Sequence, residues 1–408
     1  MSLLSNARAA AARFDPAVWR VLLHSTLIGL ALSIADLLFN FYLVSAGYGN
    51  DVAGDFSTLY RVAGVVFGLP IGLMIDRIGA RRALLVGVFG YAAAWVLLLS
   101  FNSFWALAIA QFLIGAASIT AGTAAVPLLT QVTSDGQRAT VFGWNASVGL
   151  MIGLLGSVVA GQLPGIVSRV FAVGPQTTFA YRGALTLVVV LALISALPVL
   201  WGVREEPRAD RLAAVANDTR PPLSVRRMLR ICLPAWLLGI GGGAILPFHN
   251  LFFRDVYGLS DAAVGAVLAT VAVGQGVGGL ITGVVAARFG VQRAAWILRL
   301  GAAPAMLLML VPSLPVAITG YFLRGFCIVA SFPLNDTLTM QIVPRQQRGR
   351  VLSIMSMTWS LGWAMTSPIS GRLQLAYGFT PVLLIAAISY VLSAWAIATL
   401  RMPAHATG

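Results

Sequence analysis

The sequence contains no lysine: all 27 basic residues among its 408 are arginine. Charge is scarce as well, at 10% of residues, and there are only two cysteines and three histidines. Cys232 and Cys327 have no CxxC spacing and no nearby histidine, so we predict no disulfide, metal or redox role for them. No glycine-rich phosphate loop follows a strand pattern. These features argue against an ATP-driven pump or an enzyme, and we expect no cofactor.

Apolar residues fill the chain instead. They make up 59% of it, and the mean hydropathy is +0.88. A soluble fold could not bury that much apolar surface. Several runs are long enough to cross a hydrocarbon layer of about 30 Å as helices. The first run follows Arg8 and Arg13 and is too long for a signal-peptide core, so we predict a retained first helix in an all-α, multi-pass membrane protein.

Polar breaks divide the chain into twelve predicted membrane helices. Their ranges are 18–46, 52–75, 83–101, 104–132, 139–163, 182–203, 230–253, 261–287, 294–312, 315–343, 350–375 and 379–401.

Arginine placement predicts the orientation, because cytoplasmic flanks of membrane helices collect basic residues. With the N-terminus inside, the predicted inner side carries the clusters at Arg77/Arg81/Arg82, 204–230, Arg288/Arg293 and Arg345/Arg348/Arg350. The predicted outer side carries only Arg169, Arg182, Arg254 and Arg372. Topology therefore accounts for the formal charge of +14 without a nucleic-acid partner. We expect a cell-membrane protein with both termini in the cytoplasm.

The chain repeats itself. "QFLIG" at 111–115 matches "YFLRG" at 321–325, a displacement of 210 (321 minus 111). "GLMIDRIGARR" at 72–82 matches "GVVAARFGVQR" at 283–293, a displacement of 211 (283 minus 72). Between the halves lies the only long polar segment, 204–228, which we interpret as a cytoplasmic linker.

Two six-helix halves, at 1–203 and 229–408, each with a Gly/Arg motif between their second and third helices, resemble the major facilitator superfamily. The resemblance covers nearly the whole chain. It implies two six-helix bundles related by a pseudo-two-fold axis, a lipid-embedded monomer, and a small-molecule substrate bound near the membrane midplane. Helices 1, 4, 7 and 10 are then expected to line a central cavity.

The Gly/Arg motif is predicted to form a gate. Its residues are Gly72, Asp76, Arg77, Gly79, Arg81 and Arg82. The glycines permit close approach and a tight turn, and the arginines hold the loop at the inner leaflet. In the family, the matching acid meets the N-terminal end of helix 11, here around 349–353. The alternative interpretation, that the loop only sets topology, leaves Asp76 without a role.

The second copy of the motif is degenerate. It retains Gly283, Arg288, Gly290 and Arg293. Ala287 replaces the acid and Gln292 replaces the second arginine. We therefore expect the two halves to gate unequally.

Glycines spaced four residues apart predict faces for close helix contact. They are Gly64, Gly68 and Gly72 in helix 2, Gly149 and Gly153 in helix 5, and Gly279 and Gly283 in helix 8.

Two departures from the family pattern affect the functional prediction. Gln111 stands in helix 4 where many members carry arginine, and Arg324 occupies the copy in helix 10. The run at 149–161 lacks the proline of the proton-driven exporters' helix-5 signature, which weakens an assignment as exporter without excluding it.

Polar residues within predicted helices are candidates for substrate or proton coupling, because a charge at the helix centre costs about 2.5–3.5 kcal/mol to insert. The candidates are Asp36, Asn40, Gln111, His249, Asn250 and Arg324. Asn40 and Asn250 are repeat mates, and interhelical hydrogen bonding is as good an interpretation as substrate contact. For His249, a satisfied structural histidine is an equal alternative.

The resemblance places helices 1 and 10 at the cavity from opposite halves, and Asp36 and Arg324 lie at a similar depth along them. We therefore predict that the two side chains face each other across the cavity as a coupling pair. A permanent ion pair that only makes both charges tolerable is the alternative. The resemblance implies that helices 2 and 9, which carry Arg61 and Arg299, lie away from the cavity centre. We therefore expect these two arginines to snorkel or to pair structurally.

These observations predict a secondary transporter of a small organic solute, coupled to protons and working by alternating access. Export of an amphiphilic compound is the first hypothesis. Uptake of an organic anion attracted by Arg324 is the alternative, and a non-transporting receptor on the same fold is a third.

Overall fold

A computed structural model describes residues 14–202, 224–344 and 347–400, and in these ranges the chain is helical and contains no strand. Six helices form the first half. They are α2 (Pro16–Ser45), α3 (Asn50–Ile78), α4 (Ala80–Ser100), α5 (Phe104–Gln131), α6 (Arg138–Phe171) and α7 (Thr178–Gly202), with the short 3-10 helix η1 (Asp135–Gln137) before α6.

The second half begins with a broken helix and continues with five long ones. The elements are α9 (Val225–Ile245), η2 (Leu246–Phe248), α10 (His249–Tyr257), α11 (Asp261–Phe289), α12 (Val291–Leu308), α13 (Leu314–Ile342), α14 (Arg348–Tyr377) and α15 (Thr380–Ala398).

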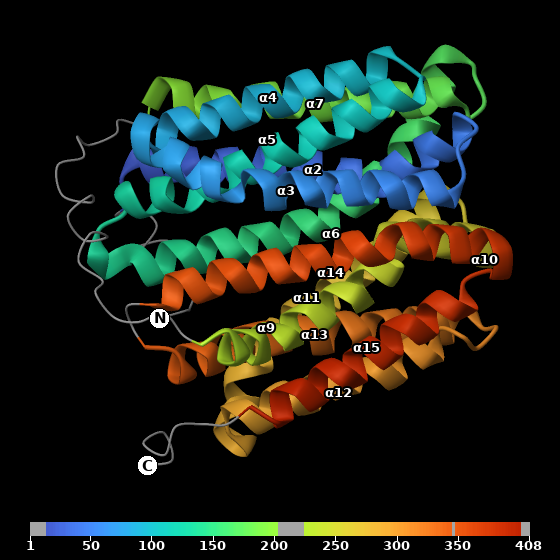
Figure 1. The fold of residues 1–408 in the computed structure, drawn as a ribbon. Helices are drawn as coiled ribbons and strands as arrows, with labels where there is room; N and C mark the ends of the chain where they lie inside the picture. Colours follow the sequence, from blue (N-terminus) through green and yellow to red (C-terminus); the bar gives the residue numbers. More distant parts are fainter. Residues whose placement is uncertain (1–13, 203–223, 345–346, 401–408) are drawn as a thin grey trace, which may run out of the picture.

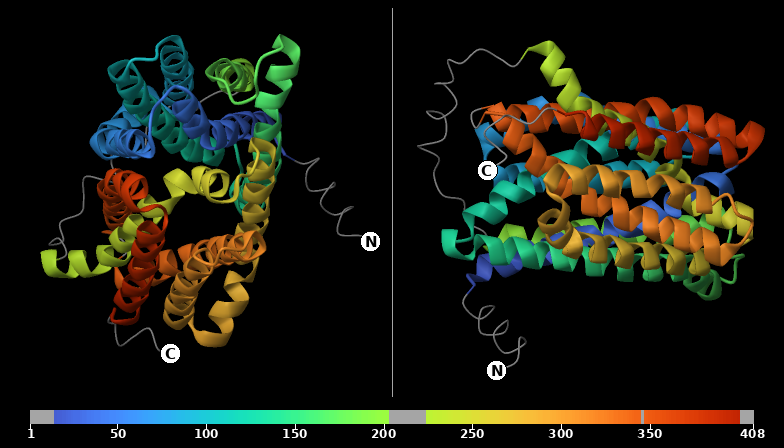
Figure 2. Two further views of the ribbon diagram at one scale, coloured as in Figure 1. Left: turned by 90° about the vertical axis from the view of Figure 1, so that its right-hand side faces the viewer. Right: turned by 90° about the horizontal axis from the view of Figure 1, so that it is seen from below.

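The two halves pack as separate helix groups that meet along their length (Figure 1). Helices α2 to α7 lie on one side and α9 to α15 on the other, as the view along the bundle also shows (Figure 2). Two helix pairs join the groups most closely, α3 with α14 and α6 with α11. We call these the α3–α14 seam and the α6–α11 seam.

The bundle has two chemically different ends. We call one of them the arginine-rich end. It contains the α3–α4 and α11–α12 turns, with Arg77, Arg81, Arg82, Arg288 and Arg293. We call the other the opposite end. It contains the α2–α3 and α14–α15 turns. Both termini of the described chain lie at the arginine-rich end (Figure 1).

Length and hydropathy make this a multi-pass membrane protein. Within the described residues, nine helices are long and apolar enough to cross a membrane, and α3, bent by 57° near Pro70, makes a tenth. A proline in a helix interior is a usual cause of such a bend. Helices α12 and α14 fall short of the same test yet pack inside the bundle.

Most predicted helices agree with the structure to within a few residues, but two differ. The fifth was expected to end at 163, whereas α6 continues through Pro164 to Phe171. The seventh was expected to be continuous over 230–253, whereas Pro247 lies in the 3-10 segment that separates α9 from α10. Of the predicted linker, 204–223 lies outside the described residues, and α9 begins at Val225.

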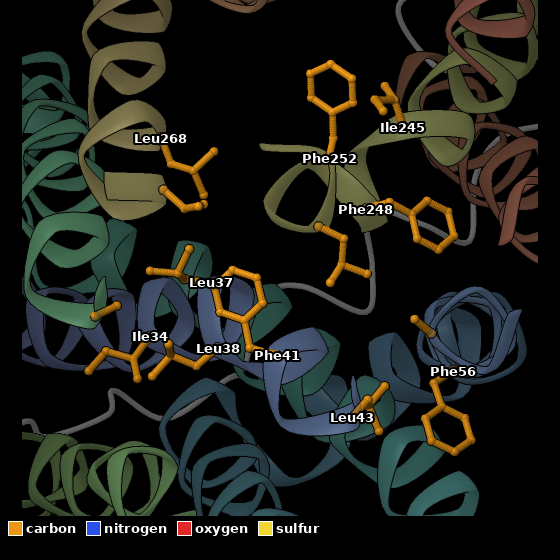
Figure 3. Packing of buried hydrophobic residues seen from close by; sticks show 14 of the residues in the cluster. Ile34, Leu37, Leu38, Phe41, Leu43, Phe56, Ile245, Phe248, Phe252 and Leu268 are labelled. Carbon is orange, nitrogen blue, oxygen red and sulfur yellow. The ribbon is translucent and has the colours of Figure 1, made fainter. Parts of the chain in front are cut away.

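Apolar side chains join the halves near this break. Leu37 and Phe41 lie on the side of α2 that faces the segment carrying Phe248 and Phe252 (Figure 3). All four are at most 1% exposed. The break in the seventh helix is therefore anchored in the core and not at the surface.

The predicted glycine faces are mostly wrong as close-contact surfaces. A Cβ added at Gly68, Gly72 or Gly149 would meet no atom within 4 Å, and the same holds at Gly279 and Gly283. Gly64 and Gly153 have a side-chain neighbour, at 3.1 Å and 3.8 Å. Other glycines, nearer the opposite end, make the close contacts between the halves.

Candidate transport site

A cavity of about 520 Å³ lies between the two halves. Residues from α2, α3, α4, α5 and α6 line it on one side, and residues from η2, α10, α11, α13 and α14 on the other. Much of its wall is aromatic, contributed by Phe39, Phe56, Tyr60, Tyr91, Trp95, Tyr321 and Trp363. Such a cavity suits a small organic molecule with an apolar body.

The helix break supplies polar backbone to this cavity. Leu246 and Pro247 line it, and their carbonyl groups bond to side chains. The Leu246 carbonyl pairs with His249 Nδ1, and the Pro247 carbonyl accepts from Asn40 Nδ2. Irregular backbone within a membrane is tolerated where it lines a cavity or is buried in protein, and transporter binding sites use it.

Asp36 and His249 face each other across the cavity. The distance from His249 Nε2 to Asp36 Oδ2 is 3.6 Å, within ion-pair range but longer than a good hydrogen bond. The Asp36 side chain is 71% exposed, and that of His249 is 8% exposed. The His249 ring also stacks on Tyr321, with centroids 6.0 Å apart.

Hydrogen-bond chemistry constrains the protons of this pair. The Leu246 carbonyl can only accept, so His249 Nδ1 carries a hydrogen. If Nε2 were unprotonated, its lone pair would face an ionised carboxylate, which is repulsive. The contact is therefore favourable only when the pair holds one further proton, either on Nε2 or on the Asp36 carboxyl.

Asn40 and Asn250 bond to each other between the halves. Asn40 Nδ2 donates to Asn250 Oδ1 at 3.0 Å, and Asn250 Nδ2 donates to the Leu37 carbonyl at 2.7 Å. Asn250 is fully buried, whereas Asn40 also lines the cavity. The interhelical hydrogen bonds considered from the sequence are thus present.

Arg324 does not pair with Asp36, so that prediction is wrong. Arg324 lies 3% exposed and donates through Nε and Nη2 to the Tyr390 hydroxyl, at 3.1 and 2.7 Å. It turns toward α15 and does not line the cavity. The depth argument sets the height of a residue along a helix but not the direction of its side chain.

Arg61 is the arginine of the cavity, contrary to the sequence prediction. Its guanidinium carbon lies 4.2 Å from the ring centroid of Trp363 and 4.7 Å from that of Trp359. Arg299, in contrast, is structural as expected, with Nε bonded to Ser331 and Nη1 to Ser393.

Gln111 is 5% exposed and lines the cavity, as expected for a residue of the fourth helix.

The halves are tied together between the cavity and the opposite end. Two clusters that contain ionisable side chains contribute to this, and the larger is largely buried. Tyr181 donates to Asp261 at 2.8 Å, and Arg254 donates to the Tyr181 hydroxyl at 3.2 Å. At the other cluster, Arg372 forms two bonds to Asp55, of 2.9 and 3.1 Å.

Both copies of the Gly/Arg motif make the predicted turn. Gly79 and Gly290 have φ of 90° and 76°, a region that disfavours side chains. Arg81 donates to the carbonyls of Val199 and Leu200 at the end of α7. Gln292, its repeat mate, donates to three carbonyls at the C-terminal end of α15 and just beyond it, those of Ile397, Ala398 and Leu400.

The substitution of glutamine for arginine in the second motif therefore preserves a contact. Arg82 and Arg293 are exposed, and Arg288 lies over the Phe289 ring at 5.6 Å. Asp76 is exposed near the end of α3, and α14 begins at Arg348, close to the predicted 349–353.

Comparison with known proteins supports the family resemblance. A model described as "Major Facilitator Superfamily" matches residues 21–242 and 231–407. The chain belongs to the major facilitator superfamily. It is accordingly a transporter and not an enzyme.

Two curated relatives illustrate how distant its neighbours are. The class B tetracycline resistance protein of Escherichia coli is 30% identical over 174 residues, 42% of this chain and 41% of that protein. The chain thus matches less than half of that relative's length. The uncharacterized MFS-type transporter YceJ of Bacillus subtilis is 26% identical over 84% of this chain and 86% of its own.

Solved structures share the fold at low identity. A bacterial homologue of the human lysosomal transporter Spinster, crystallised inward-facing and unoccupied, has a TM-score of 0.73 at 16% identity, covering 95% of this chain and 98% of that one. The nucleoside transporter NupG has a TM-score of 0.76 at 14% identity, covering 93% and 98%. The two-bundle architecture is therefore established by family and by fold.

Proposed function

We propose that this protein is a proton-coupled secondary transporter of a small organic amphiphile in the cell membrane. The observation that carries the proposal is the Asp36–His249 pair, which connects the two halves inside an aromatic cavity. Ionisable residues within membrane helices are costly and, where they face a cavity, are usually functional. Export is the direction we propose first, supported by the apolar, aromatic cavity and by the limited similarity to a tetracycline resistance protein.

The pair provides a mechanism for coupling. With one proton bound, Asp36 and His249 attract each other and hold α2 against α10. Loss of that proton leaves the Nε2 lone pair facing a carboxylate, so the attraction between the halves is lost. A proton thus binds one conformation better than the other, which is the requirement for driving alternating access.

We further propose the orientation and the gate. The arginine-rich end faces the cytoplasm, since basic residues collect there. The closed seams at the opposite end then correspond to an inward-facing conformation. Asp76 is proposed to hold the arginine-rich end closed in the other conformation, by meeting the positive N-terminal end of α14.

The test uses purified protein in liposomes. A thermal-shift screen of amphiphilic compounds, starting with tetracycline, identifies a transported probe. Wild-type protein is expected to accumulate that probe against its gradient when a proton gradient is imposed. Asp36→Asn should abolish this accumulation while probe exchange is partly retained. The sign of proton flux distinguishes export from uptake.

Asp255→Asn is the matched control, because Asp255 is an exposed acid on α10 outside the cavity. It should behave as wild type. Gradient-driven accumulation by Asp36→Asn at the wild-type level would contradict the proposal.

A further inference from the structure

We propose that Arg61 binds an anionic group of the transported solute, so that the solute is an aromatic organic anion such as a carboxylate. This inference rests on the proposed transport function and specifies its substrate class.

The geometry of Arg61 is the first argument. It lies close to the middle of α3, lines the cavity, and is held over the rings of Trp359 and Trp363 from the other half. Tyr60 adds a third ring at 5.6 Å. Within the described chain, no acceptor hydrogen-bonds to the guanidinium and no carboxylate forms an ion pair with it.

The second argument is chemical. Stacking on aromatic faces partly compensates a guanidinium for lost hydration but leaves its N–H donors free, because those donors lie in the plane of the group. A planar fork of donors fits a carboxylate with two parallel hydrogen bonds. Two buried arginines of the second half differ, since each donates through two of its nitrogens to hydroxyl groups. Arg324 donates through Nε and Nη2 to Tyr390. Arg299 donates through Nε to Ser331 and through Nη1 to Ser393, and only its Nη2 lacks a partner.

The internal repeat shows that the other seam joins the halves without an arginine at the position that matches Arg61. Its mate in the α6–α11 seam is Ala272, displaced by 211 (272 minus 61). The mates of Trp359 and Trp363 are Gly149 and Gly153, each displaced by 210. That seam joins the halves with alanine and glycine where the α3–α14 seam has arginine and tryptophan. The cluster of Arg61, Trp359 and Trp363 is thus not required to bring the two halves together in the other seam.

The charge balance of the cavity completes the case. With one shared proton, Asp36 and His249 are together neutral, which leaves Arg61 as the net charge among the ionisable residues that line the cavity. A monoanion neutralises it. Phe39, Phe56 and Trp95 then provide contacts for an apolar ring.

The experiment compares two probes of equal shape, 2-naphthoate and the neutral 2-naphthamide, by calorimetric titration of the purified full-length protein. Wild type is expected to bind the carboxylate about ten- to a hundredfold more tightly, as a charge-assisted hydrogen-bonded pair supports. Arg61→Gln should remove this preference and leave amide binding unchanged. Arg169→Gln, which changes an exposed arginine outside the cavity and outside the Gly/Arg motif, should keep the preference.

Equal binding of both probes by the wild type would overturn the inference. This comparison uses wild-type protein alone, so it does not depend on whether a variant folds. A preference that persists in Arg61→Gln would overturn it as well. The titration is done at equilibrium without a proton gradient, so its failure leaves proton-coupled transport standing. Loss of coupled transport with intact anion preference would instead contradict only the proposed function.

Discussion

The two seams close in the same way but are chemically different. In the α3–α14 seam a Cβ at Gly54 would lie 2.4 Å from the Ser367 carbonyl oxygen. In the α6–α11 seam a Cβ at Gly265 would lie 2.4 Å from the Ser157 carbonyl oxygen. Gly54 and Gly265 are repeat mates, displaced by 211 (265 minus 54). The repeat thus preserves the steric condition for bringing the halves together.

What the repeat does not preserve is the cavity chemistry beside each seam. The α3–α14 seam places Arg61 against Trp363, and the α6–α11 seam places Ala272 against Gly153, with 3.8 Å between the Ala272 Cβ and a Cβ at Gly153. The shared glycines therefore bring the halves together, and the unshared residues include those that we propose for solute recognition.

The two polar clusters that join the halves, Tyr181–Asp261–Arg254 and Asp55–Arg372, differ as well. The Tyr181–Asp261–Arg254 cluster is largely buried and stacks Arg254 over Phe41 at 4.6 Å. The Asp55–Arg372 pair is partly exposed, with 29% and 58% of the side chains accessible. Exposed pairs contribute little, commonly about 0–1 kcal/mol. The exposed Asp55–Arg372 pair is therefore a weak tie between the halves.

The largest effect on transport is expected from disrupting the close glycine contact that both seams share. Gly54→Ala and Gly265→Ala each place a methyl group against a backbone carbonyl that cannot move aside, and such overpacking costs about 1–3 kcal/mol. Both variants should widen the opposite end and reduce transport severalfold. Electron–electron distance measurements between spin labels at Ser103 and Pro312 would report the opening.

Gly68→Ala is the matched control, since open space surrounds its added Cβ, and it should match the wild type. If either seam variant kept the wild-type distance distribution, the proposed equivalence of the two seams would be lost.

The repeat made much of this fold readable from sequence. A displacement of 210 or 211 indicates two halves, matches the motif of Gly79 to that of Gly290, and identifies Asn40 and Asn250 as repeat mates, for which an interhelical hydrogen bond is one of two predictions. Hydropathy located the helices because a continuous apolar run has few alternatives to a membrane helix. Asp36 was also identified as a cavity candidate, because an acid within such a run is costly.

Rotation about the helix axes could not be read in the same way. All-round apolar helices carry almost no periodic signal to show which face points inward. Arg324 is therefore predicted to face the cavity, whereas its side chain turns toward Tyr390. Arg61 is predicted outside the cavity for another reason, because the family resemblance places helix 2 away from the centre, yet it lines the cavity. The partner of His249 also depended on the break at Pro247, whose backbone geometry no periodicity predicts.

The next effect concerns the two motif copies. Only the first has an acid, and Asp76→Asn should weaken its proposed contact with the α14 N-terminus by about 1 kcal/mol, as expected for a charge at a helix end. The variant should transport more slowly and shift the resting population toward the inward-open form. Spin labels at Thr140 and Val284 would measure the arginine-rich end.

Ala287→Ser, at the matching position of the second copy, should be nearly silent in the same measurements. An unchanged distance distribution in Asp76→Asn would remove Asp76 from the gate and leave topology as the role of this loop.

The smallest effect should come from making the two copies alike at their second basic position. Gln292→Arg restores the residue found at Arg81, and both side chains donate to carbonyls at the end of the last helix of their half. An arginine fork can donate to the same carbonyls, so Gln292→Arg should change the melting temperature only slightly. Gln292→Ala should lower it more, because alanine cannot make the three hydrogen bonds that Gln292 Nε2 donates. Thermal unfolding in detergent measures both. If the arginine variant were as destabilised as the alanine variant, Arg81 and Gln292 would not be equivalent caps, and the motif copies would differ in structure as well as in charge.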